Sequence, residues 1–165
     1  MPACLQYGLS SVIQFDLPET SILLDRHGPT CEPIDDPAAA VAAGFANPIN
    51  FPPLQQAITS EDRVALVLAP GVPNAEAILA GAVYALAEAG IEASQITIVY
   101  DPTEASLSGH DITAGIPPAY QSQVQIVAHD PTDREKLAYL AANSQDGTVY
   151  FQRDIGEADV VIPIV

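Results

Sequence analysis

Basic residues are scarce in this chain of 165 residues, which has 5 lysines and arginines against 21 aspartates and glutamates and a formal net charge of −16. Nucleic-acid binding needs lysine and arginine to neutralise phosphates, so the composition argues against a nucleic-acid partner. The same charge argues against binding to an anionic membrane surface. No apolar run approaches the length of about 20 residues that spans a bilayer.

Cysteine is also rare, and Cys4 and Cys31 match neither a CxxC nor a zinc-finger spacing. We therefore expect no metal site from them. Residues 1–7 contain neither a basic segment nor a long apolar segment, so a secretory signal peptide is not expected. The prediction that follows is a cytoplasmic protein with reduced thiols.

The chain does contain 48% hydrophobic residues, enough at this length for one domain with its own core. Val64–Leu68 and Ile96–Tyr100 are continuous apolar runs, typical of strands that are buried on both faces. Between these runs an apolar stripe predicts a helix that is capped by Asn74, ends near Ala89 and stops at Gly90. Such a β–α–β unit predicts parallel pairing.

The flanking segments extend this alternation into an α/β fold, a mostly parallel Rossmann-like sheet with flanking helices and a short N-terminal β-hairpin. The hairpin is predicted from residues 12–15 and 21–24. Asp36 and Pro37 predict the start of an alanine-rich helix. The remaining predictions are a short helix within residues 104–115, a helix over 133–142 with Leu137 and Leu140 inward, strands at 124–127 and 149–152, and a buried strand at 160–165.

In an open parallel sheet, ligands bind beyond the carboxyl ends of the strands. The first such loop, residues 69–73, contains Pro70 and Gly71 and has no ionisable group. It matches neither GxGxxG nor a P-loop, so no dinucleotide or P-loop phosphate site is predicted. The helix start at Asn74 could still attract an anion through its N–H groups. A simple tight turn is the alternative interpretation.

The second loop begins with Asp101 and continues through Thr103 and Glu104. Its two carboxylates could act as an acid and a base, or could bind a hard cation. Alternatively, Thr103 caps the following helix and Glu104 lies in the first helical turn.

Three histidines could take part in acid–base chemistry. His27 lies in a loop rich in glycine and proline, where we expect solvation. His110 is the histidine nearest the predicted crevice. His129 follows a predicted strand, and Asp130 beside it could polarise the ring as a base. The His129–Asp130 pair could equally be structural, satisfying backbone groups of the loop.

An ordered series of short motifs, which runs along essentially the whole chain, resembles the N-terminal domain of the lactate racemase family. The motifs are Asn47-Pro48-Ile49, Pro52-Pro53-Leu54, Asp62-Arg63-Val64, His129-Asp130-Pro131-Thr132-Asp133, Asp146-Gly147-Thr148-Val149-Tyr150 and Glu157-Ala158-Asp159-Val160-Val161-Ile162. The resemblance implies a single domain over residues 1–165, cut from or lacking a C-terminal domain. It also implies a family chemistry in which a nickel–pincer nucleotide racemises or epimerises 2-hydroxy acids by hydride transfer.

The resemblance further implies two catalytic loops, one like Asp-His-Thr-Arg-Pro and one like Thr-Gly-x-His-Arg-Pro. In their places this chain has Ala69-Pro70-Gly71-Val72-Pro73 and Asp101-Pro102-Thr103-Glu104-Ala105. Without the arginine there is no bidentate hold on a carboxylate, and without the histidine the proton acceptor is missing. The lysine that carries the family's cofactor and its nickel-binding histidine belong to a later segment, so we expect no cofactor on this chain alone.

The leading hypothesis is therefore a domain that is non-catalytic on its own and binds a small organic acid or a C-terminal domain of the same polypeptide. One alternative is a divergent nickel–pincer-dependent racemase or epimerase of a 2-hydroxy acid, formed when the C-terminal domain is joined. Another is an isomerase that uses Asp101, Glu104 or His110 in new roles. A third is a structural or interaction domain with an exposed apolar patch.

Overall fold

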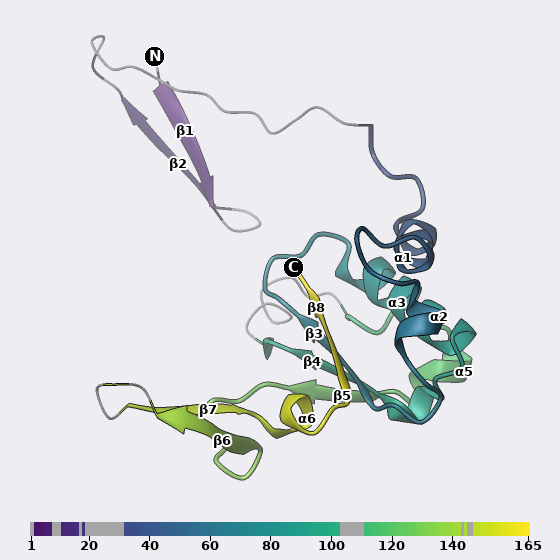
Figure 1. Ribbon diagram of the computed structural model, residues 1–165. Coiled ribbons are helices and arrows are strands. Elements are labelled where there is room, and N and C mark those ends of the chain that lie inside the picture. Colours follow the sequence, from purple (N-terminus) through teal and green to yellow (C-terminus); the bar gives the residue numbers. More distant parts are fainter. Residues whose placement is uncertain are drawn as a thin grey trace. The chain divides into compact units, whose positions relative to one another are not determined.

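The computed structural model describes residues 2–7, 11–16, 18, 32–102, 111–142, 144 and 147–165 (Figure 1). The chain divides into two compact units, Met1–Ile34 and Asp35–Val165. Within the described ranges, every helix is too short or too polar to cross a membrane.

The first unit contains the predicted hairpin with a different pairing. Strand β1 (Pro2–Tyr7) runs antiparallel to β2 (Ser11–Asp16), with Pro2 opposite Asp16 and Tyr7 opposite Ser11. Residues 12–15 thus pair with the segment before them, and residues 21–24 lie outside the described part of the chain. In the sequence, the two strands are separated by three residues that include a glycine, and hairpins favour such brief connections.

The second unit is built on a four-stranded sheet with the order β5-β4-β3-β8. These strands are β3 (Val64–Leu68), β4 (Ile96–Tyr100), β5 (Gln125–Ala128) and β8 (Val160–Ile164). Every pairing in this sheet is parallel, which confirms the predicted α/β class. The strands predicted at 64–68, 96–100 and 124–127 are confirmed to within one residue.

Helix α3 (Ala75–Glu88) packs against this sheet and forms the core with it. Leu79, Val83 and Leu86 recur every three or four residues, so they share one face of the helix, and all three are buried. Gly90 follows the helix with φ +96°, a conformation that favours glycine, and thereby ends it as predicted. The core side chains from the strands are Val64, Leu66, Ile96, Ile98 and Ile164.

Helix α1 (Pro37–Ala46) starts as the sequence predicts. The Asp36 carboxylate accepts a hydrogen bond from the Ala39 backbone N–H at 3.0 Å, and Pro37 lies in the first turn. The helix packs on α3 so closely that a Cβ atom on Gly81 would come within 2.8 Å of the Ala38 Cα. Shorter helices are α2 (Leu54–Ala57), α5 (Pro118–Gln121), α6 (Arg153–Gly156) and the 3-10 helix Ala93–Gln95.

The helix predicted over residues 133–142 is wrong. Its second part is strand β6 (Leu137–Ala142), which pairs antiparallel with β7 (Thr148–Gln152) in a separate two-stranded ribbon (Figure 1). Leu137 is buried, but Leu140 is 65% exposed rather than inward. Turns before Leu137, including Lys136 N–H to Asp133 O at 3.2 Å, leave a segment too short for a stable helix, and β7 supplies a partner strand.

The strand predicted at 160–165 exists as β8, but it is an edge strand and not a buried one. Among the described strands it pairs with β3 alone, and Val161 on it is 43% exposed. The Val160 N–H donates to Arg63 O, and Ile164 O accepts from the Ala69 N–H, so the backbone groups of these two residues point toward β3. Backbone groups alternate along a strand, so the nitrogen of Pro163 points to the free edge, where no hydrogen bond is lost.

Candidate functional site

The carboxyl edge of the parallel sheet is the predicted site, and the structure brings its loops together. The register places Leu68 beside Tyr100 and Tyr100 beside Ala128. The chain therefore leaves β3, β4 and β5 at neighbouring points, through residues 69–73, residues from Asp101 onward and His129. This arrangement is the one in which open α/β sheets hold ligands.

The first loop is exposed and carries no ionisable side chain. Gly71 has φ +78°, and a Cβ there would meet nothing within 4 Å, so the backbone conformation rather than space favours glycine. Asn74 precedes α3 in a left-handed conformation (φ 53°), and its side chain makes no capping hydrogen bond. The helix start was predicted, but the side-chain cap was wrong, since such caps need extended backbone at that residue.

The second loop is described only at its start, where Asp101 and Pro102 are half-buried. Thr103, Glu104 and His110 lie outside the described residues. The acid–base pair and the cation site proposed for Asp101 and Glu104 therefore stay predictions, as does any role of His110. Residues 111–115, where the predicted short helix would end, form turns instead.

His129 lies directly beside the start of that loop. Its backbone N–H donates to Tyr100 O at 2.9 Å, one residue beyond the β4–β5 pairing. Its ring Nδ1 lies 3.0 Å from the side-chain oxygen of Gln152. Sequence reasoning missed Gln152, because the residue lies 23 positions away and becomes a neighbour only through the β6–β7 ribbon.

Asp130 has a local structural role. Its Oδ1 accepts hydrogen bonds from the Thr132 hydroxyl at 2.6 Å and the Thr132 backbone N–H at 2.8 Å. These bonds, the hydroxyl first, hold the pKa of the Asp130 carboxyl below its ordinary value. The structural interpretation of this aspartate fits, and the hydrogen-bond partner of the His129 ring is Gln152.

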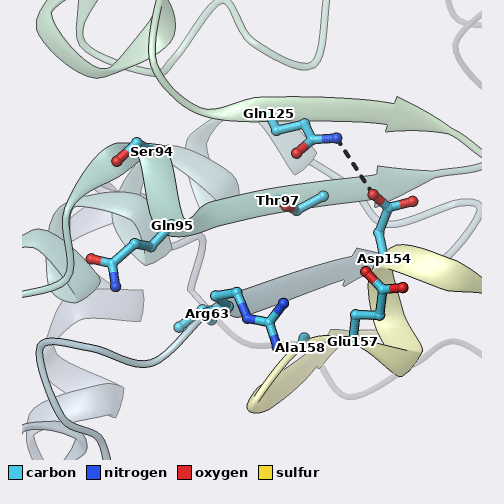
Figure 2. A pocket seen from close by; sticks show the side chains of 9 residues that line it. Arg63, Ser94, Gln95, Thr97, Gln125, Asp154, Glu157 and Ala158 are labelled. Atoms are coloured by element: carbon cyan, nitrogen blue, oxygen red, sulfur yellow. Dashed lines mark hydrogen bonds between the residues drawn. The ribbon is translucent and has the colours of Figure 1, made fainter.

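A small polar hollow of about 150 Å³ lies at the opposite, amino edge of the sheet (Figure 2). Arg63, Thr97, Gln125, Asp154 and Glu157 help to line it, and Gln125 donates to Asp154 at 3.4 Å. This hollow combines both signs of charge with neutral amides, so its chemistry does not single out one class of ligand.

Beside that hollow, Arg63 connects the start of β3 to the start of β8. Its backbone N–H and its Nε both donate to Asp159 Oδ2, at 2.9 and 3.3 Å. The backbone bond and then the side-chain bond keep the pKa of Asp159 below its ordinary value. This pair is structural, because it joins the residues that precede β3 and β8.

An apolar groove of about 580 Å³ runs along β8, between that strand and the segment that carries α2. Phe45, Phe51 and Leu54 line one side of it, and Val161 and Ile162 line the other. Phe51 is 66% exposed, which is unusual for so large an apolar side chain.

The donor set for a nickel cofactor is not found in the described part of the chain. No group of three or more His, Cys, Asp or Glu side chains there could hold a metal ion. Lys136, the single lysine of the sequence, pairs with Asp133 at 3.3 Å in the turn before β6. The described residues thus do not fit the metal-bound group, and we derive no chemical step through it.

Comparison with known proteins identifies the fold and the family. A solved structure of the lactate racemase apoprotein from Thermoanaerobacterium thermosaccharolyticum matches with a TM-score of 0.58 at 18% identity, over 99% of this chain. The chain spans 38% of the length of that protein, and at this identity the likeness shows the fold alone. No curated protein matches the chain significantly. The family model of the lactate racemase N-terminal domain matches residues 7–164, nearly the full length, and the chain therefore belongs to that family.

Proposed function

We propose that this chain is a ligand-binding domain of the lactate racemase type that has no racemase activity of its own. The observation that carries the proposal is the residue content of the two loops at the carboxyl edge. Where the family resemblance implies histidine and arginine, the chain has Ala69 to Pro73 and Asp101 to Ala105. Those loops offer neither a guanidinium to hold a carboxylate nor an imidazole to take a proton from a hydroxyl.

The ligand class that we infer is a small organic acid at this edge. The start of α3 supports it, since the Asn74 side chain does not cap the helix and the Ala77 N–H is the first-turn group that donates to Asn74 O, at 3.0 Å. Two features oppose tight binding, namely Glu76 in the same first turn and the net charge of −16. Because salt screens long-range repulsion, we expect weak binding that is not lost as ionic strength rises.

A racemisation assay tests the catalytic half of the proposal. D-lactate is incubated with the chain, nickel and a synthetic nickel–pincer nucleotide, and the enantiomer ratio is followed over time. We expect the ratio to stay that of the protein-free control. Racemisation above that control would overturn the proposal in favour of the divergent racemase, and loss of turnover in Glu104→Gln or Asp101→Asn would then assign the new acid or base.

An NMR titration with lactate tests the binding half. We expect chemical-shift changes in the amides of Ala69, Gly71, Asn74 and Asp101, with little change at the amino edge around Thr97. Titration with sodium chloride at the same ionic strength is the control for non-specific effects. Absence of localised shifts at millimolar lactate would contradict the ligand assignment.

We also propose that a C-terminal domain of the same polypeptide covers the apolar groove along β8. The name of the matched family and the coverage of 38% of the solved relative support a longer protein. Exposed apolar side chains such as Phe51 and Val161 are the surface that such a domain would bury.

The test compares amide hydrogen exchange of the 165-residue chain with that of the full polypeptide that its gene encodes. We expect residues 51–58 and 160–165 to gain protection in the longer protein, while the ribbon residues 138–141 serve as an internal reference. Equal exchange at the groove in both proteins, or a gene that encodes no further domain, would contradict this assignment.

The cytoplasmic location stays a prediction from the composition. Thiol titration of freshly purified protein, with both Cys4 and Cys31 expected to react under denaturing conditions, would support it. An oxidised pair would count against it.

A further inference from the structure

Gln152 is a buried polar side chain that lies between the His129 ring and the Asp154 carboxylate. It is only 2% exposed and ends strand β7, directly before α6. Its amide oxygen lies 3.0 Å from His129 Nδ1, and its amide nitrogen donates to Asp154 Oδ2 at 2.8 Å. Buried polar groups are normally hydrogen-bonded, and these two bonds hold the three side chains in place. We call the hydrogen-bonded series Asp154–Gln152–His129 the relay.

The direction of these bonds follows from the carboxylate. A glutamine alone can present either its oxygen or its nitrogen to a neighbouring ring. A carboxylate only accepts hydrogen bonds, and that of Asp154 already accepts one from Gln125 at 3.4 Å. The Gln152 nitrogen must therefore face Asp154, and its oxygen faces His129. Because that oxygen only accepts, His129 Nδ1 must carry the hydrogen.

A neutral imidazole with its hydrogen on Nδ1 has a lone pair on Nε2. Within the described residues, the His129 ring makes no hydrogen bond besides the one to Gln152. The ring is half-buried, and the residue lies beside Tyr100 at the carboxyl edge of the sheet. A ring held in one tautomer thus belongs to a residue at the edge where the two loops lack the imidazole that the family resemblance implies.

We propose that His129 is a ligand-binding residue whose Nε2 accepts a hydrogen bond from the hydroxyl of a small hydroxy acid. Gln152 and Asp154 act as positioning residues, since they reach the ligand only through the ring. The ligand class rests on the proposed function above, whereas the tautomer does not. The relay joins β7 and α6 to the end of β5, so it forms only in the folded chain.

The tautomer is measured directly by long-range ¹H–¹⁵N correlation of the histidine rings at alkaline pH, where imidazoles are neutral. The chain has only three histidines, so His27→Gln and His110→Gln assign the His129 signals. We expect the Nδ1–H form for His129 in the unmodified chain. In Gln152→Leu and in Asp154→Leu we expect a shift toward the Nε2–H form, because the acceptor for His129 is removed or the Gln152 amide is free to reverse.

The matched control is Gln125→Leu, which removes the other hydrogen-bond donor to Asp154 and leaves Gln152 in place. We expect its His129 signals to stay those of the unmodified chain. Asp154 is half-buried, so Asp154→Leu keeps the test decisive if Gln152→Leu fails to fold, as judged from the amide spectrum. An Nε2–H form in the unmodified chain, or an Nδ1–H form that persists in Asp154→Leu, would overturn these hydrogen-bond directions.

The ligand role is tested by titrating the same sample with lactate and with propionate, which lacks the hydroxyl. We expect lactate alone to shift His129 Nε2. If loop amides respond to lactate and His129 does not, the role of His129 fails while the proposed function stands. If neither responds, the proposed function and the ligand role fail together, and the tautomer result still decides the relay.

Discussion

The four-stranded sheet and the β6–β7 ribbon contain similar side chains and bury them very differently. In the sheet, Leu66 and Ile98 are completely buried, whereas in the ribbon Leu140 is 65% exposed and Tyr139 is 60% exposed. Helices α1 and α3 pack together and α3 covers the sheet, whereas in the described part of the chain the main contacts of the ribbon are between its two strands and with α6 at its base. An apolar sequence pattern thus indicates which segments could be buried, and the tertiary structure decides which of them are buried.

The base of the ribbon shows how so small a sheet is held. A two-stranded hairpin is marginal by itself in water. Here Leu137 is buried, and the Arg153 backbone N–H donates to Lys136 O at 2.8 Å. The Arg153 side chain also donates to Glu135 O at 3.2 Å. These contacts anchor the ribbon at its base, whereas the side chains of Tyr139 and Leu140 farther along it are mostly exposed.

Truncating one leucine in each region gives the largest expected contrast. Leu66→Ala should lower the free energy of unfolding by about 2–5 kcal/mol, because it leaves a cavity in a closed core. Leu140→Ala should change it by less than about 0.5 kcal/mol, as for an exposed surface residue. Urea unfolding followed by circular dichroism measures both. Similar losses in the two variants would show that the ribbon is as tightly covered as the sheet.

Substitutions of two helical glycines test how closely α1 packs on α3. Gly81→Ala places a methyl group against the Ala38 backbone and should destabilise the chain by about 1–3 kcal/mol. Gly44→Ala is the matched control, because a Cβ there meets nothing within 4 Å. It should stabilise α1 by about 0.5–1 kcal/mol through the better helix propensity of alanine. Thermal unfolding of both variants measures the opposite signs, and a stabilising Gly81→Ala would disprove the close approach of α1 and α3.

A smaller effect is expected at the ribbon. The Arg134 guanidinium carbon lies 4.4 Å from the centre of the Tyr150 ring, a cation–π contact at an exposed site. Arg134→Ala should cost about 0.5–1 kcal/mol. Because the ribbon can open locally, the loss should show as faster amide exchange in β6 and β7 with little change in β3. Unchanged exchange in the ribbon would mean that the contact adds nothing, and Arg134→Lys tests whether charge alone suffices.

The smallest expected effect concerns Asp159, whose pKa lies below the ordinary value of 3.8 because of the bonds from Arg63. A carboxyl with a lowered folded-state pKa stabilises the fold above pH 3.8, and this stabilisation is lost as the pH falls through the lowered value. Asp159→Asn should therefore melt slightly below the unmodified chain at neutral pH. The difference should shrink in acid, and a difference that grows on acidification would reverse the assigned direction.

Local signals were sufficient for the sheet and its main helix. Each of these elements was predicted from residues that lie close together in the sequence. The signals are the continuous apolar runs at 64–68 and 96–100, the apolar stripe through Leu79 and Leu86, and Gly90. The segment 137–142 has an apolar pattern that suits either a helix or a strand. Its outcome depended on pairing with β7, which no local signal announces.

The candidate site divides in the same way. The sequence located the carboxyl edge, because the alternation of strands and helices already implies where open sheets hold ligands. It also showed which side chains the two loops contain, since these depend on residue identity alone. It could not find the partner of His129, because the false helix over 133–142 left the correctly predicted strand at 149–152, which ends at Gln152, without its partner strand β6.

The sequence by itself thus determined the family, the parallel α/β core and the start of α1 at Asp36. Only the tertiary structure decided that β8 is an edge strand, that β6 and β7 form a ribbon, and that Gln152 connects Asp154 to His129. The physical reason is the range of the interactions involved. Helix caps, apolar periodicity and turn glycines act between near neighbours in the chain, whereas strand order and buried hydrogen-bond partners are fixed only when distant segments meet.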